Sequence, residues 1–122
     1  MYNNIAVIYN ILGLLPTIQE GLNHIQKQLS ELRYEQALDL LEDTMMGIAS
    51  IESALQPIII ESGENTKEMK FEALKKSMSK VVSLYETGKE TELERQIQET
   101  ILPEFKAWKE ELDRVLKPLV LS

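Results

Sequence analysis

The sequence predicts an all-α protein, an antiparallel up-and-down four-helix bundle in a single domain over residues 1–122. Apolar residues recur with a period near 3.6 through most of the chain, which is typical of amphipathic helices. The apolar pattern of the first half returns in the second half at an offset of 56 residues. Each half therefore forms one helical hairpin, about residues 1–60 and 67–122, and the two hairpins bury their stripes against each other. The matched pairs are Ile18 with Leu74, Leu22 with Met78, Ile25 with Val81, Ala37 with Leu93 and Leu41 with Ile97.

The composition is that of a globular protein and excludes several function classes. Of the residues, 43% are hydrophobic and 27% are charged, as in ordinary folded domains. The chain has no cysteine, which excludes disulfides, thiolate metal sites and cysteine nucleophiles and favours a reducing cytoplasm. The net charge of −7 disfavours nucleic acid and anionic membranes as partners, because both are negatively charged.

The first helix covers at least residues 18–32, where apolar residues keep the helical period. Its start has two interpretations. Thr17 and Glu20 have the spacing of a capping box, which would begin a new helix after Pro16. Alternatively, the helix runs from about residue 3 and carries Pro16 on its outer side, where a proline would kink it. We favour the continuous helix.

The segment before Pro16 has more apolar surface than one face of a bundle requires. Residues 1–19 carry no charged side chain, and the apolar positions from 5 to 15 spread over about half of the helical wheel. The segment lacks the positive start and cleavage site of a secretory signal, and it is too short to span about 30 Å of hydrocarbon. We therefore expect no membrane insertion, and we expect self-association or partner binding through Ile5, Ile8, Leu12 and Leu15.

The second helix, about residues 35–59, follows a tight connection at residues 30–34 that makes it the antiparallel neighbour of the first. Gly47 and Pro57 weaken this helix, and residues 62–66 form the clearest loop of the chain. Its predicted core stripe is Ala37, Leu41, Thr44, Ile48, Ile51, Leu55 and Ile59.

Glu52 lies beside the core stripe of the second helix, where an acid is unusual. It either pairs with a lysine of the third helix or lines a groove left open for a ligand. Partly buried carboxylates usually find a cation, which favours the ion pair.

The third helix, about residues 67–86, is expected to end before Gly88, which supplies the left-handed residue after the last turn. Its predicted core face is Phe71, Leu74, Met78, Val81 and Tyr85, with Val82 on the flank. The fourth helix begins near Glu90, with Leu93, Ile97 and Thr100 toward the core. After Pro103 the apolar stripe is rotated by about 70° from the earlier one. We therefore expect Pro103 to kink or break this helix.

His24 and Lys27 form the one arrangement that suggests chemistry. Histidine phosphotransfer domains resemble this chain in size and architecture, and they carry an exposed histidine with a basic residue three positions later, as in His24-Ile25-Gln26-Lys27. That family continues with glycine and a small residue, whereas this chain has Gln28 and Leu29. The resemblance implies phosphotransfer through His24 as the alternative function, and we favour an ordinary surface histidine.

Other catalytic classes lack the residues they need. A di-metal carboxylate bundle requires Glu-x-x-His pairs, and the chain has one histidine and no such pair. The five glycines are isolated from one another, so no phosphate-binding loop is present, and hydrolase and zinc patterns are also missing. The sequence therefore predicts no enzyme, no metal site and no cofactor.

Phe105 and Trp108 lie just past Pro103, and Trp108 is the only tryptophan. They form either the aromatic end of the core, which we favour, or exposed anchors for a partner. With Leu112, the acidic balance and the apolar first segment, they resemble flagellar export chaperones of the FliS and FliT kind. Those small bundles hold a helical protein in an apolar groove and can cover it with a terminal segment of their own. The chain is also similar to uncharacterised small helical-bundle proteins of Gram-positive bacteria.

These observations predict a cytoplasmic, non-enzymatic interaction module or chaperone-like bundle that self-associates as a homodimer or binds a protein partner. The residues expected to contact the partner are Ile5, Ile8, Leu12, Leu15, Phe105 and Trp108.

Overall fold

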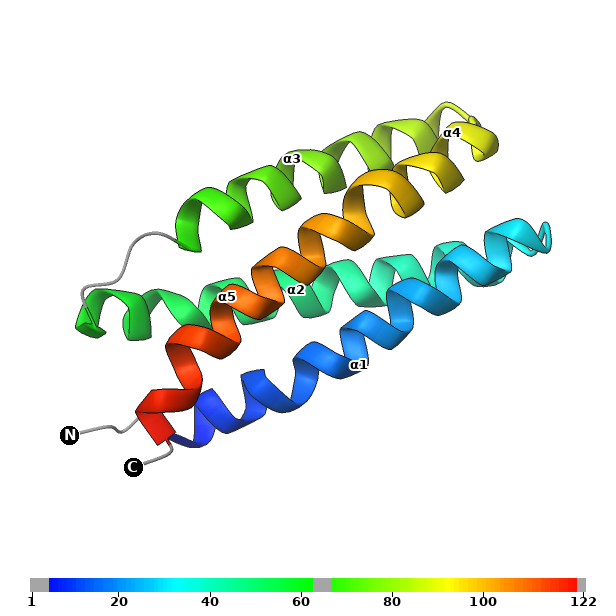
Figure 1. Cartoon of the computed structure of the whole chain (residues 1–122). Coiled ribbons are helices and arrows are strands. Elements are labelled where there is room, and N and C mark those ends of the chain that lie inside the picture. The colour runs from blue at the N-terminus through cyan, green and yellow to red at the C-terminus, as the bar shows by residue number, and fades with distance from the viewer. Residues whose placement is uncertain (1–4, 63–66, 121–122) are drawn as a thin grey trace.

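The computed structural model describes residues 5–62 and 67–120, and this part of the chain is helical apart from two short turns. The last three elements follow one another without a break, so the described residues form four helical rods (Figure 1). The prediction of an all-α protein with four helices is confirmed. The elements are α1 (Ile5–Ser30), α2 (Tyr34–Ser62), α3 (Lys67–Glu86), α4 (Glu90–Gln96), the π-helical turn η1 (Ile97–Ile101) and α5 (Leu102–Val120).

Helix α1 continues through Pro16, in agreement with the favoured of the two interpretations. Pro16 is exposed, so its side of the helix faces solvent. Water there can satisfy the backbone carbonyl that a proline leaves without its usual donor. By length and composition α1 could also cross a membrane, which is weak evidence because core helices of soluble proteins pass the same test.

The turn between α1 and α2 is closed by a leucine in the left-handed conformation. Leu32 has a φ of 61°, its N–H donates to the Leu29 carbonyl, and the Arg33 N–H donates to the Gln28 carbonyl. This is the Schellman pattern of hydrogen bonds, which ordinarily has glycine at this position. The prediction that the first helix extends to residue 32 is wrong, because α1 ends at Ser30 and leaves Leu32 71% exposed.

The turn between α3 and α4 has the same pattern with the usual glycine. Gly88 has a φ of 71°, as predicted. The Gly88 N–H donates to the Tyr85 carbonyl, and the Lys89 N–H donates to the Leu84 carbonyl.

A π-helical turn lies just before Pro103. In η1 the Leu102 N–H donates to the Ile97 carbonyl, five residues back instead of four. A π turn takes in one residue more than an α turn, and one residue corresponds to about 100° on the helical wheel. This cancels the rotation of about 70° between the two apolar stripes to within about 30°, so Leu93, Ile97, Ile101 and Phe105 are all buried. Ile101 thus takes the core position that the sequence analysis gave to Thr100, which is only partly buried.

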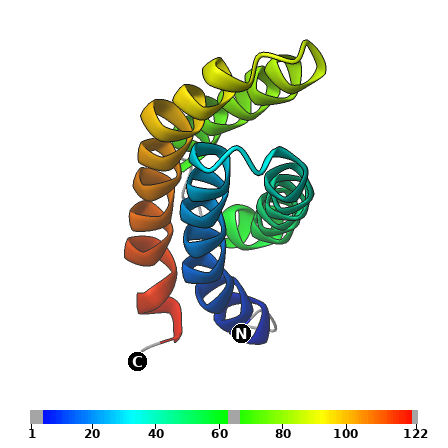
Figure 2. The same ribbon diagram turned by 90° about the vertical axis from the view of Figure 1, so that its right-hand side faces the viewer.

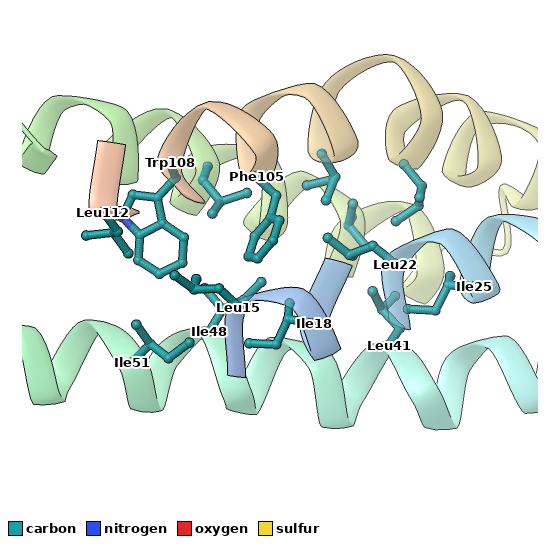
Figure 3. Close-up of a cluster of buried hydrophobic side chains, with 14 of the residues drawn as sticks. Leu15, Ile18, Leu22, Ile25, Leu41, Ile48, Ile51, Phe105, Trp108 and Leu112 are labelled. Atoms are coloured by element: carbon teal, nitrogen blue, oxygen red, sulfur yellow. The ribbon is translucent and has the colours of Figure 1, made fainter. Parts of the chain in front are cut away.

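Three pairs of long helices pack closely around the core: α1 with α2, α1 with α5, and α3 with α5. Helix α1 lies between α2 and α5, and α5 also packs against α3 (Figure 2). The core holds Leu15, Ile18 and Leu22 of α1, facing α2 and the aromatic side chains of α5 (Figure 3). In the part of the chain that the structure describes, α2 and α3 approach each other less closely than the other neighbouring helices do. The side of the bundle between α2 and α3 is therefore the most loosely packed.

Candidate interaction groove

The open side between α2 and α3 contains two cavities, of about 270 and 300 Å³, one toward each end of the helices. We call them the aromatic cavity and the tyrosine cavity. The aromatic cavity is lined by Glu52, Leu55, Gln56, Ile59, Phe71, Glu72 and Trp108. The tyrosine cavity is lined by Leu38, Asp39, Leu41, Glu42, Met45, Val82, Tyr85 and Glu86. We refer to the two cavities together as the groove. Between them, side chains of both helices, among them Met45 and Met78, enclose a space of only about 10 Å³.

The rings of Phe71 and Trp108 form the floor of the aromatic cavity, and Phe105 packs against Trp108 in the core below it. The Trp108 ring lies 5.3 Å from the Phe71 ring, centroid to centroid, with an interplanar angle of 43°. It lies 5.9 Å from the Phe105 ring, edge to face. Trp108 is only 1% exposed, so the cavity ends on a fixed apolar surface.

Glu52 stands at the rim of the aromatic cavity. The Gln56 amide Nε2 donates to Glu52 Oε1 over 2.7 Å. No described lysine or arginine side chain lies within 4.0 Å of the Glu52 carboxylate, so the favoured ion pair is not formed among those residues. The other interpretation, an acid that lines an open groove, agrees with its position.

The tyrosine cavity has the more exposed apolar wall. Val82 is 40% exposed and Tyr85 is 50% exposed, although the sequence predicts Tyr85 on the core face of α3 and Val82 on its flank. The prediction that Tyr85 is buried is wrong, because its side of α3 faces the tyrosine cavity. Leu84 is buried instead. A third cavity, of about 260 Å³, shares Leu38 and Tyr85 with the tyrosine cavity and extends toward the α3–α4 turn.

Among the side chains that the structure describes, every charged one that lines the aromatic or the tyrosine cavity is acidic. Glu52 and Glu72 line the aromatic cavity. Asp39, Glu42 and Glu86 line the tyrosine cavity. The groove therefore combines an apolar floor with a negative rim, which is the usual anatomy of a protein-binding surface with a charge preference.

Comparison with protein families places the chain in one of them. The model of the family described as "Domain of unknown function (DUF8042)" matches residues 6–111. The chain belongs to this family. The match extends from α1 into α5 and includes every residue that lines the groove. Comparisons with curated proteins and with solved structures find no match.

The structure separates the six side chains predicted to contact a partner. Ile8, Leu15, Phe105 and Trp108 are at most 1% exposed, so they stabilise the core of their own chain. Leu12 packs against the core and is partly buried. Ile5 is 42% exposed. Of the six, only Trp108 reaches a cavity of the groove.

The two residues of the phosphotransfer alternative are not among those that line the groove. His24 and Lys27 are exposed, one turn apart on α1, away from the groove. Among the residues that the structure describes, no group of three histidine, aspartate or glutamate side chains could hold a metal ion.

Proposed function

We propose that this protein is a cytoplasmic, non-enzymatic interaction module, an antiparallel up-and-down bundle that holds a helical segment of another protein. The segment binds in the groove between α2 and α3. The observation that carries the proposal is the open α2–α3 side, where two cavities with apolar floors and acidic rims follow each other along the helices. Binding of an amphipathic helix in such a groove is a common mode of peptide recognition.

The exposed apolar side chains of α3 support this interpretation. Val82 and Tyr85 leave large parts of their apolar surface in water, and both line the tyrosine cavity. Apolar surface that is gathered in a groove marks an interface more often than scattered apolar residues do. A chaperone-like role, in which the groove shields the apolar face of a client helix, fits the same geometry.

Site-specific photo-crosslinking in cells tests the proposed function. A photoreactive side chain at Val82 points toward the groove, whereas one at Ser83 lies about 100° around the same helix. Both residues are exposed. We expect a cross-link to a second protein from position 82 and none from position 83. The cross-link should disappear when Leu38, on the opposite wall of the tyrosine cavity, is changed to lysine.

Cross-links of equal yield from both positions, or from position 83 alone, would contradict the proposed function. The folded state of each variant is checked by its circular dichroism spectrum, since all three positions lie on helix surfaces that are exposed or partly exposed.

Phosphotransfer through His24 is the alternative function. It is tested by incubating the protein with a labelled small phosphodonor. Label that enters the wild-type chain and is absent from the His24→Ala variant would replace the interaction module with a phosphotransfer domain.

A further inference from the structure

We infer that the groove accepts an amphipathic helix with basic side chains at both ends and two apolar anchors about 14 residues apart. This inference rests on the proposed function and names the chemistry of the partner. It depends on three observations: the charge of the groove rim, the position of one lysine, and the spacing of the two cavities.

The acids of the rim favour a basic partner. Five carboxylates line the two cavities, and none of the lysine and arginine side chains described by the structure lines either of them. The whole chain carries a net charge of −7, so the field around the groove has the same sign as the rim. Lysines or arginines beside each anchor would reduce the repulsion between these carboxylates and speed association.

One lysine refines this pattern. Lys75 is four residues from Phe71 and seven from Val82, so it lies on the same face of α3 between the two cavities. Its side chain is exposed. A basic residue in the middle of the partner helix would be repelled by the positive charge of Lys75. We therefore place the basic residues of the partner near its two anchors and a neutral or acidic residue between them.

The spacing of the cavities sets the distance between the anchors. On α2 the aromatic cavity is centred near residue 55 and the tyrosine cavity near residue 41. With a rise of 1.5 Å per residue, this separation corresponds to about 21 Å. A helix that lies along α2 reaches both cavities with side chains about 14 residues apart, which is four turns. Those two side chains would then lie on nearly the same face.

The same charges argue against a second copy of this chain as the occupant. Residues 34–62 contain six acids and no base, so a second α2 in the groove would place carboxylates against carboxylates. Like charges at an interface disfavour association and are a common means of rejecting wrong partners.

A designed peptide tests the inference directly. The probe is an alanine-rich helix of about 21 residues with two leucine anchors about 14 residues apart and two lysines beside each anchor. Its binding to the full chain is measured by fluorescence anisotropy of a dye on the peptide. One comparison peptide carries glutamate in place of each lysine. We expect it to bind at least about tenfold more weakly. A second comparison peptide has its anchors about seven residues apart, and we expect a similar loss because only one cavity is filled.

Two neighbouring acids of α2 provide a matched pair of protein variants. Both side chains are exposed. Glu42 lines the tyrosine cavity, whereas Asp43 lies about 100° around the helix and does not line it. Glu42→Lys should weaken binding of the lysine peptide and strengthen binding of the glutamate peptide. Asp43→Lys, which changes the net charge equally, should change the ratio of the two affinities several-fold less.

Any of three binding results would overturn the inference: equal binding of the lysine and glutamate peptides, equal effects of Glu42→Lys and Asp43→Lys, or no binding of the lysine peptide. The oligomeric state, measured by light scattering, is a fourth test. A dimer that Val82→Lys dissociates and Ser83→Lys leaves intact would place a second copy in the groove. If the peptide experiments fail but position 82 still cross-links to another protein, the proposed function stands. Only the inference that the partner is a basic helix is then wrong.

Discussion

The ring of Phe71 in α3 and the ring of Trp108 in α5 lie 5.3 Å apart and join the core to the open groove. Trp108 is 1% exposed, and Phe71 is partly buried. Both rings line the aromatic cavity, but Trp108 is held within the core and Phe71 leaves part of its ring exposed. The two residues differ in what they contribute to stability and to binding.

Trp108→Ala should lower the free energy of unfolding by about 3–5 kcal/mol, the usual loss when a buried aromatic side chain is removed. Phe71→Ala should cost less, because part of the ring already faces the cavity. Chemical denaturation followed by circular dichroism measures both values. The milder variant Trp108→Phe keeps a ring in the core and guards against a chain that does not fold. A loss under about 0.5 kcal/mol for Trp108→Ala is typical of a surface residue and would contradict the observed burial.

Leu32→Gly should stabilise the protein by about 0.5–1 kcal/mol. The left-handed conformation costs a residue with a Cβ roughly 1–2 kcal/mol, and the greater freedom of glycine in the unfolded chain returns part of that gain. Leu32 has a φ of 61° and a side chain that is 71% exposed, so its removal loses little packing. The midpoint of urea denaturation measures the change.

The turn between α3 and α4 allows the opposite substitution, from glycine to a residue with a Cβ. Gly88 has a φ of 71°, and a Cβ added there meets no atom within 4 Å. Gly88→Ala should therefore lose about 1 kcal/mol through backbone strain alone. Effects of the same sign at Leu32 and Gly88 would show that the left-handed conformation does not determine the stability of these turns.

Gly13→Ala and Gly21→Ala compare two glycines of the same helix. Alanine is favoured over glycine by about 0.8–1.0 kcal/mol inside a helix. A Cβ at Gly13 meets no atom within 4 Å, so the whole gain should be seen there. At Gly21 it would lie 3.2 Å from Thr44 Oγ1, which already donates to the Leu40 carbonyl. We expect a smaller gain or a loss at Gly21.

The Thr44→Ala background separates the steric effect from helix propensity. Removal of Oγ1 takes away the only neighbour within 4 Å of the added Cβ, so Gly21→Ala should then gain as much as Gly13→Ala. Thermal denaturation of the double-mutant set measures this coupling. Identical effects of Gly21→Ala in both backgrounds would rule out the contact as the cause.

Helical periodicity predicted the core better than it predicted the groove. The predicted stripe of α2, from Ala37 to Ile59, is buried, because its neighbour α1 is fixed by a short turn. Val82 and Tyr85 have the same apolar character, yet they line an open surface. Periodicity reports which side of a helix is apolar. It does not report whether another helix covers that side, which depends on the crossing of elements far apart in the chain.

The π turn illustrates a second limit. The rotation of the apolar stripe near Pro103 is visible in the sequence, but a kink, a break and a wide turn all account for it. Which of these forms depends on the carbonyl that accepts a hydrogen bond from the Leu102 N–H. In the structure this acceptor is the Ile97 carbonyl. Periodicity carries no information about that hydrogen bond.

If η1 holds one residue more than an α turn, removal of one exposed residue should convert it to α-helix and keep both stripes in register. Glu99 is exposed within η1. We combine its deletion with Pro103→Ala, so that the straightened helix regains the missing N–H. The variant should unfold in one cooperative transition within about 2 kcal/mol of the wild-type stability, measured by chemical denaturation.

The matched control deletes Glu110 in the same Pro103→Ala background. Glu110 is also exposed, but it lies in regular α-helix. Its loss rotates Leu112, Val115 and Leu116 by about 100° away from the core. Each buried leucine then loses packing worth about 2–5 kcal/mol, which is enough to unfold a domain of ordinary stability. Equal destabilisation by the two deletions would mean that the π turn fixes the geometry of the helix in some way other than by accommodating one extra residue.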